Sequence, residues 1–299
     1  MTLTPARLVA AVASRTIPRL ERRTFGRKLL RRLPVGRRWL VLFTTGAQAG
    51  HVVVPLRRGI FDLDLADDVE RALYYRCYED GELSACLAVV EEGDTVIDVG
   101  ANVGAYTVPL ARTVGSRGSV HAFEPMASVA DRLSRNCALS RCQQQVKVNR
   151  VALSDATGTA EFFDAGEGHS GWGSLEQFAD VDFAATTTTT TSLDDYVRSN
   201  SIPHARLVKI DVEGHDLSVI QGARKILSDG FADYLLVEGN EKRLRGAGHS
   251  TFELVDTVTG LGFVLQNAWP RLRRDIQVDT AEICCSAGVP GRARTQSKR

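Results

Sequence analysis

A block of nine residues combines a carboxylate with two glycines in an order that suits a nucleoside ligand. The block Val96-Ile-Asp-Val-Gly-Ala-Asn-Val-Gly104 is typical of a buried strand that runs into a glycine turn and then a helix. Gly100 and Gly104 allow a ligand to approach the backbone closely, and free N–H groups at the helix start can bind polar or anionic groups. Glu124 follows the next apolar run, where a carboxylate can hydrogen-bond ribose hydroxyls.

This layout fits either a dinucleotide or S-adenosylmethionine. The two glycines are spaced G-x-x-x-G, whereas dinucleotide sites typically use G-x-G-x-x-G. A carboxylate at Asp98 would repel a pyrophosphate but would suit the ammonium and sulfonium groups of S-adenosylmethionine. The pattern therefore favours S-adenosylmethionine over NAD. The alternative that remains is a strand–turn–helix unit without a ligand.

A second block, Lys209-Ile-Asp-Val-Glu-Gly214, places two acids after another apolar run. Because α/β enzymes keep their sites at the carboxyl edge of the sheet, we expect Asp211 and Glu213 to lie there. Two such carboxylates can orient an acceptor hydroxyl, act as the general base or bind a divalent ion. Glu238, after the next predicted strand, can join them. We favour the roles that need no metal.

Short apolar runs alternate with helical patterns from residue 94 onwards. The predicted strands are Thr95–Val99, Ser119–Phe123, Val146–Val151, Arg206–Ile210 and Tyr234–Val237, and two more, Gly262–Gln266 and Ala281–Cys285, follow. The predicted helices are Val103–Val114, Met126–Leu139, Leu217–Leu227 and Thr251–Thr259. This alternation predicts a doubly wound α/β fold with a mostly parallel sheet that is covered on both faces.

We expect four segments along the chain. They are a basic, partly helical arm over residues 1–40, a hairpin and helical lead-in over 41–90, the main domain over 91–288 and a basic flexible tail over 289–299. The hairpin is predicted from Val41–Thr44 and His51–Val54. Asp164–Gln177 has the glycine content of a long loop, and the threonine run Thr186–Thr191 is typical of a strand.

The basic arm suggests a polyanionic neighbour. Residues 1–40 carry eleven Lys and Arg but one acid, whereas the net charge of the whole chain is +1. Such an arm favours an anionic membrane surface or nucleic acid as a partner, or else docks on the acidic body. We expect peripheral contact with the inner face of a membrane and regard nucleic acid as the less favoured partner.

Composition excludes several classes of protein. Hydrophobic residues make up 43% and charged residues 24% of the 299 residues, which excludes global disorder and a fibrous repeat. No apolar run approaches the ~20 residues that span a bilayer, and we expect no cleaved secretory signal. The six cysteines include no C-x-x-C spacing, so we expect reduced thiols in the cytoplasm rather than disulfides or a zinc site.

Taken together, the motifs resemble those of the FkbM-type methyltransferase family. The resemblance covers about residues 90–240 and rests on the two blocks above, on His121-Ala-Phe-Glu-Pro125, Asn136, Ala152-Leu-Ser-Asp155 and on Ser192-Leu-Asp-Asp195. It implies a class I methyltransferase (Rossmann-like) fold with S-adenosylmethionine as donor. It also implies that the acceptor is a hydroxyl group, often on a sugar, a glycolipid or a polyketide-like natural product.

The resemblance also implies roles for individual residues. The methionine end of the cofactor would be lined by Asp98, Gly100, Asn102 and Gly104. Glu124 would hold the ribose and Asp155 the adenine amino group, with a plain turn aspartate as the alternative for Asp155. Asp211, Glu213 and His215 are the candidate catalytic residues.

Two histidines are candidates for the general base. His215 and Asp216 stand where the family usually has a small residue and a glutamate, and an imidazole beside two carboxylates can accept a proton. His169 lies in the glycine-rich loop. A surface or incidental role is the alternative for both. Pro109 also departs from expectation, because a proline inside the helix after the glycine turn would kink it.

Three other functions compete with an O-methyltransferase. A methyltransferase for RNA or protein is supported by the basic arm, but the sequence lacks an Asn/Asp-Pro-Pro-aromatic block of the kind that holds a flipped base. A non-catalytic nucleotide-binding module would leave the acids around Asp211 purely structural. An NAD-linked oxidoreductase is the least favoured of the three.

Overall fold

The computed structural model describes residues 50–56, 59–76, 78, 80–164, 166, 168–178, 184–265 and 281–287. The basic arm over residues 1–40, the predicted strand Val41–Thr44 and the tail over 289–299 lie outside the described residues. In the described part of the chain, no helix is long and apolar enough to cross a membrane.

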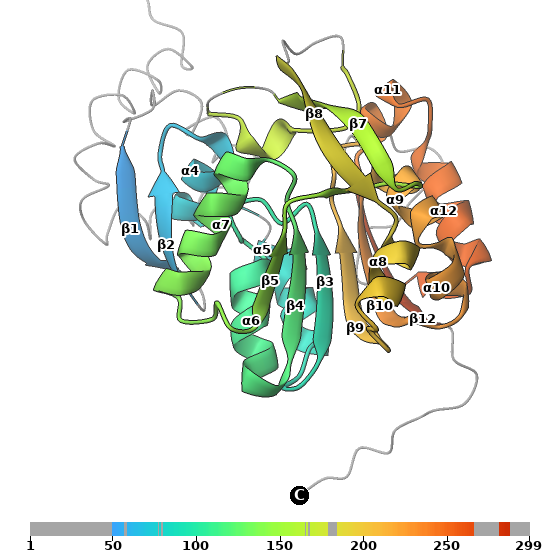
Figure 1. The fold of residues 1–299 in the computed structure, drawn as a ribbon, viewed down its shortest axis with the longest axis horizontal. Helices are drawn as coiled ribbons and strands as arrows, with labels where there is room; N and C mark the ends of the chain where they lie inside the picture. Colours follow the sequence, from blue (N-terminus) through green and yellow to red (C-terminus); the bar gives the residue numbers. More distant parts are fainter. Residues whose placement is uncertain are drawn as a thin grey trace, which may run out of the picture.

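Seven strands of the described chain form the central sheet (Figure 1). They are β3 (Thr95–Val99), β4 (Ser119–Phe123), β5 (Val146–Asn149), β9 (Ala205–Ile210), β10 (Ala232–Gly239), β11 (Phe263–Leu265) and β12 (Ala281–Ala287). Their order is β11-β12-β10-β9-β3-β4-β5, and β12 runs antiparallel to its neighbours. The chain winds from β3 outward through β4 and β5, then returns to β9 and winds the other way. This order confirms the expected doubly wound sheet and class I methyltransferase fold.

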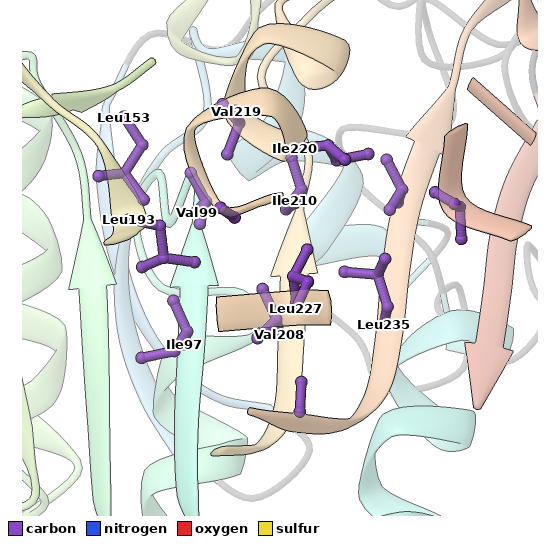
Figure 2. Close-up of a cluster of buried hydrophobic side chains, with 14 of the residues drawn as sticks. Ile97, Val99, Leu153, Leu193, Val208, Ile210, Val219, Ile220, Leu227 and Leu235 are labelled. Atoms are coloured by element: carbon purple, nitrogen blue, oxygen red, sulfur yellow. The ribbon is translucent and has the colours of Figure 1, made fainter. Parts of the chain in front are cut away.

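Helices cover both faces of this sheet, as the alternating pattern predicts. One face packs on α5 (Asp80–Val89), α6 (Thr107–Val114) and α7 (Ala127–Leu139). The other packs on α8 (Leu193–Ser199), α9 (Asp216–Gly222), α10 (Arg224–Ser228) and α12 (Thr251–Gly260). Neighbouring strand residues point to opposite faces, so Val96 joins the first core and Ile97 the second. Figure 2 shows the second core, where Leu193 and Leu227 lie against Ile97 and Val208.

The described part of the lead-in contains a hairpin that the sequence pattern did not predict. The strand β1 (His51–Leu56) includes the predicted strand His51–Val54 and forms a hairpin with β2 (Gly59–Asp64). The predicted pairing of His51–Val54 with Val41–Thr44 lies outside the described residues. The strand β2 packs on α7, where the Asp62 N–H donates to Asn136 Oδ1 at 2.8 Å. The helix α4 (Asp68–Tyr75) follows, and Asp67 caps it by accepting from the Glu70 N–H. The lead-in is therefore anchored to the main domain through its backbone.

A smaller sheet lies beyond the carboxyl ends of β3, β4 and β9 (Figure 1). It consists of β6 (Ala152–Leu153), β7 (Gly158–Asp164) and β8 (Ala184–Thr191) in the order β6-β8-β7. The threonine run forms β8, as predicted. A loop with the short helix η2 (Ser170–Trp172) leaves β7, and α11 (Glu241–Gly246) follows β10. The short helix η1 (Gly115–Arg117) joins α6 to β4.

Pro109 causes no kink, because α6 begins at Thr107 rather than at Val103. Proline therefore occupies the first turn, where its missing N–H would have had no helical partner. Residues 101–106 form the turn that follows β3 instead of a helix. The predicted helix Leu217–Leu227 is also divided, at Ala223, into α9 and α10.

Candidate active site

A cavity of about 300 Å³ opens at the carboxyl ends of β3, β4, β9 and β10. Its wall on the sheet side includes six of the residues singled out in the sequence: Gly100, Asn102, Glu124, Asp211, Glu213 and His215. Glu238 lines it as well. The opposite wall comes from the loop around η2 and from the start of α4. This is the edge at which open α/β sheets bind ligands, where the strand order reverses between β3 and β9.

Gly100 fixes the distance between the two central strand ends. Its φ is +76°, and a Cβ atom at this position would lie 1.8 Å from the Asp211 carbonyl oxygen. Any other residue would push β3 and β9 apart. The glycine thus brings the first sequence block against the second, which the sequence alone does not show. Gly104 has a different role from the expected one, because it packs against Leu133 and does not line the cavity.

Asp98 lies below the cavity wall and not in it. It is fully buried, and its Oδ2 accepts a hydrogen bond of 2.5 Å from Thr107 Oγ1. Lys209 Nζ lies 3.8 Å from Asp98 Oδ1 and 3.0 Å from Asp211 Oδ2, and it donates to the Gly100 carbonyl at 3.3 Å. Burial raises the pKa of Asp98, against the opposing charge of Lys209. Asp98 therefore acts on the site through Lys209, which joins both sequence blocks.

Glu124 is arranged to accept hydrogen bonds inside the cavity. Its Oε2 accepts from the Asn102 N–H and its Oε1 from the Met126 N–H, both at 3.0 Å. Each carboxylate oxygen keeps a second lone pair for a ligand hydroxyl. Burial raises the pKa of Glu124 to about 7.

The raised pKa of Glu124 makes the stability of the protein depend on pH. A carboxyl with a pKa of about 7 when folded and about 4.5 when unfolded stabilises the fold below pH 4.5. That contribution is lost as the pH rises through 7. We expect the free energy of unfolding to lose up to about 3 kcal/mol over this range from Glu124 alone. Urea titrations at several pH values should show a smaller loss in Glu124→Gln than in the exposed control Glu161→Gln. Equal losses in the two variants would contradict the assignment.

Three carboxylates from two strand ends meet at one place. Asp211, Glu213 and Glu238 each offer an oxygen within 4.8 Å of the other two. Glu213 has a left-handed φ of +53° and forms an ion pair of 3.2 Å with Arg243. Such strained backbone positions are common at functional sites.

Glu238 has a strongly perturbed environment within this group of three carboxyl groups. Burial and the negative charges of Asp211 and Glu213 raise the pKa of Glu238 well above its usual value. Glu238 shares a hydrogen bond with Asp211, while its Oε2 has no hydrogen-bond partner. The group can orient a hydroxyl and take its proton, and its oxygen ligands also suit a hard cation. That no metal is needed stays a prediction, which a chelator tests.

Comparison with known proteins decides the family. A family model described as the methyltransferase FkbM domain matches residues 98–263, more than half of the chain. The chain belongs to the FkbM methyltransferase family. It is 31% identical over 152 residues to the hexuronic acid methyltransferase AglP of Haloferax volcanii. That match covers 51% of this chain and 58% of the relative, so it spans less than two thirds of the relative's length.

Two solved structures are similar to this FkbM domain. A methyltransferase FkbM from Methylobacillus flagellatus is 14% identical, with a TM-score of 0.40, over 93% of this chain and 60% of that chain. An S-adenosylmethionine-dependent O-methyltransferase from Thermotoga maritima is 16% identical, with a TM-score of 0.42, over 72% of this chain and 67% of that chain.

The donor groups of this FkbM domain fit S-adenosylmethionine. Glu124 offers carboxylate oxygens for the ribose, and the turn at Gly100 and Asn102 lines the wall between Glu124 and the three carboxylates. An apolar part of the wall follows β5 and includes Val151 and Leu153, which suits a flat purine. Asp155 is exposed and absent from the cavity wall, so the structure does not bring it to the expected adenine site.

The two histidines are engaged as structural contacts. His215 Nε2 lies 2.9 Å from Ser154 Oγ, and its Nδ1 lies 2.8 Å from Glu176 Oε1. Both ring nitrogens are occupied, so His215 reaches the cavity wall without a free nitrogen for an acceptor. His169 Nδ1 contacts Asp68 Oδ2 at 2.8 Å and helps to fasten the η2 loop to α4.

Sequence reasoning missed the residues that hold the second block and the loop in place. Asp216 is fully buried and accepts from the N–H groups of Val212 and Gly214, which shapes the turn that carries Glu213. Ser174 Oγ donates to the Glu213 carbonyl at 3.0 Å. The position of Asp216 at the start of a predicted helix was a signal in the sequence that this residue could accept hydrogen bonds from backbone N–H groups. The contact between Ser174 and Glu213 joins distant parts of the chain, so no local sequence pattern indicates it.

The thiols that the structure describes agree with the sequence. Cys86, Cys137 and Cys142 are buried and form no disulfide.

Proposed function

We propose that this FkbM domain transfers the methyl group of S-adenosylmethionine to a hydroxyl of a sugar or glycan. The observation that carries the proposal is the convergence of Asp211, Glu213 and Glu238 in the same cavity as Glu124. One end of the cavity offers a ribose partner and the other offers groups that can hold and deprotonate a hydroxyl. The sugar class is supported by the hexuronic acid methyltransferase among the relatives.

Different residues of the chain would have different roles in such a transfer. When bound, S-adenosylmethionine supplies an electrophilic methyl group on a positively charged sulfur. Glu238 and Asp211 would hold the acceptor hydroxyl, and Asp211, which pairs with Lys209, would accept its proton. The share of the chain in the transfer to the hydroxyl oxygen would be to align that oxygen with the methyl group and to take up the released proton at Asp211. Alignment contributes most to the rate, because the donor is already activated.

The cavity weighs against an RNA substrate. Five carboxylates line it, and none of the other described lining residues is a lysine or an arginine. A polyanion would meet like charges there, whereas nucleic-acid sites are positively charged.

We expect the full chain to bind S-adenosylmethionine and not NAD. The carboxylates around the glycine turn favour a cation and disfavour a pyrophosphate. Isothermal titration with each ligand decides between them. Tight binding of NAD without binding of S-adenosylmethionine would overturn the proposed cofactor.

We also propose that residues 1–40 deliver the acceptor by lying on an anionic membrane surface. Each Lys or Arg near such a surface contributes about 1 kcal/mol, and salt screens the attraction. The chain should sediment with anionic vesicles at low salt, and deletion of residues 1–40 should abolish this without changing affinity for S-adenosylmethionine. If the intact chain does not sediment with anionic vesicles at low salt, the better interpretation is that residues 1–40 pack against the rest of the chain.

A further inference from the structure

In the part of the chain that the structure describes, the cavity is lined by acidic side chains and by no lysine or arginine. Its charged lining residues are all carboxylates: Asp68, Glu124, Asp211, Glu213 and Glu238. His215 also lines the cavity, but its Nε2 contacts Ser154 and its Nδ1 contacts Glu176. Among the described lining residues, therefore, nothing can neutralise a negatively charged acceptor.

The cations next to the cavity are already matched by acids. Lys209 lies between Asp98 and Asp211, and its side chain is 4% exposed. Arg243 pairs with Glu213 and lies over the Trp172 ring, and Arg71 pairs with Asp68. A carboxylate on the acceptor would have to displace one of these ion pairs, or be buried without a partner. Burying an unpaired charge is strongly unfavourable.

The hydrogen-bonding groups of the cavity are complementary to hydroxyls. An ionised carboxylate only accepts hydrogen bonds, and each sugar hydroxyl has one to donate. Trp172 lines the same cavity, and its flat apolar face suits the C–H side of a sugar ring. A carboxylate on the ring offers acceptors alone, so it would face the wall carboxylates without a donor between them.

Repulsion among the acids of the wall points the same way. The pKa of Glu238 is raised well above its usual value by the neighbouring acids Asp211 and Glu213 as well as by burial. The acids in this part of the cavity therefore already repel one another, and a further carboxylate would add to that repulsion.

We propose that the acceptor is an uncharged, hydroxyl-rich sugar ring and that this cavity discriminates against the corresponding uronic acid. The inference rests on the proposed function, since it assigns the acceptor class of the same site. It follows from the acids that line the cavity and from the lack of an available cation among its described lining residues, because a cavity built for a uronic acid needs such a cation.

Matched pairs of neutral and acidic sugars test the inference. The full chain is incubated with S-adenosylmethionine and a chelator, using methyl glucoside against methyl glucuronide, and the galacto and manno pairs likewise. Mass spectrometry measures the methylated product, and kcat/KM is compared within each pair. We expect the neutral member of a pair to be preferred by at least about tenfold, the factor that corresponds to 1.4 kcal/mol.

The outcomes separate the inference from the proposed function. Equal or better transfer to the uronides overturns the inference and leaves the proposed function standing. Transfer to neither class, while S-adenosylmethionine still binds, counts against the proposed function and removes the inference with it.

A variant tests the cause of the preference. Glu213→Gln leaves the charge of Arg243 unmatched beside the cavity. The ratio of kcat/KM for the neutral sugar to kcat/KM for the acidic sugar should therefore fall several-fold, whatever the change in absolute rate. The exposed control Glu161→Gln should keep the native ratio. An unchanged ratio in Glu213→Gln would show that cavity charge does not set the preference.

Discussion

Asp211→Asn should lower the turnover number by about 100- to 10,000-fold, the range typical for loss of a general base. The Asp211 carboxylate ends β9, contacts Lys209 at 3.0 Å and shares a hydrogen bond with Glu238. Asparagine keeps the shape of the side chain but cannot take the hydroxyl proton. The affinity for S-adenosylmethionine should change little, because the expected cofactor contacts lie at Glu124 and the glycine turn.

Paired measurements test this separation of turnover from binding. Turnover is followed with a hydroxyl acceptor and cofactor affinity by titration, and Asp131→Asn, an exposed carboxylate paired with Arg150, is the control. Equal losses in turnover and in cofactor affinity would place Asp211 on the cofactor instead. Repeating the native assay with a chelator tests the expectation that no metal is needed, since a lost rate would assign the three carboxylates to a cation.

Glu124→Ala is expected to weaken binding of S-adenosylmethionine by about 1.5–3 kcal/mol, the usual value of a hydrogen bond to a charged group. This corresponds to roughly a 10- to 150-fold rise in the dissociation constant. The titration is best done at pH 8, where a carboxyl with a pKa of about 7 is mostly ionised. An unchanged circular dichroism spectrum would show that the fold persists.

Glu92→Ala is the matched control for this variant, because Glu92 is exposed and lies far from the cavity wall. It should bind S-adenosylmethionine as the native protein does. If Glu124→Ala also binds with native affinity, the ribose is held elsewhere.

The sequence was sufficient for the parts of the fold that rest on periodic hydrophobic patterns. The predicted bounds of β3 and β4 match the structure, because short β-branched runs between turns specify buried parallel strands. The convergence of Asp211 and Glu238 was also foreseeable, since parallel strands end at one edge. The pairing of β1 with β2 was not predicted, because the two-residue gap between these strands carries a weak turn signal.

The rest of the site depends on contacts that local sequence does not encode. Asp155 follows the third strand as expected, yet its side chain points to solvent and receives a hydrogen bond from Ser154. His215 adjoins the second block, but Ser154 and Glu176 come from distant segments and occupy both its nitrogens. Arg243 reaches Glu213 from a helix that begins after β10. These arrangements are set by packing of the loops over the sheet.

Label transfer tests the central claim most directly. The full chain is incubated with S-adenosylmethionine carrying a deuterated methyl group and with a mixture of cell-envelope glycans, and the products are examined by tandem mass spectrometry beside an Asp211→Asn reaction. The proposed reaction predicts one deuterated methyl on a sugar hydroxyl, present with the native chain and nearly absent with the variant. Label that appears on nucleic acid or protein instead, or in equal amounts in both reactions, would contradict it.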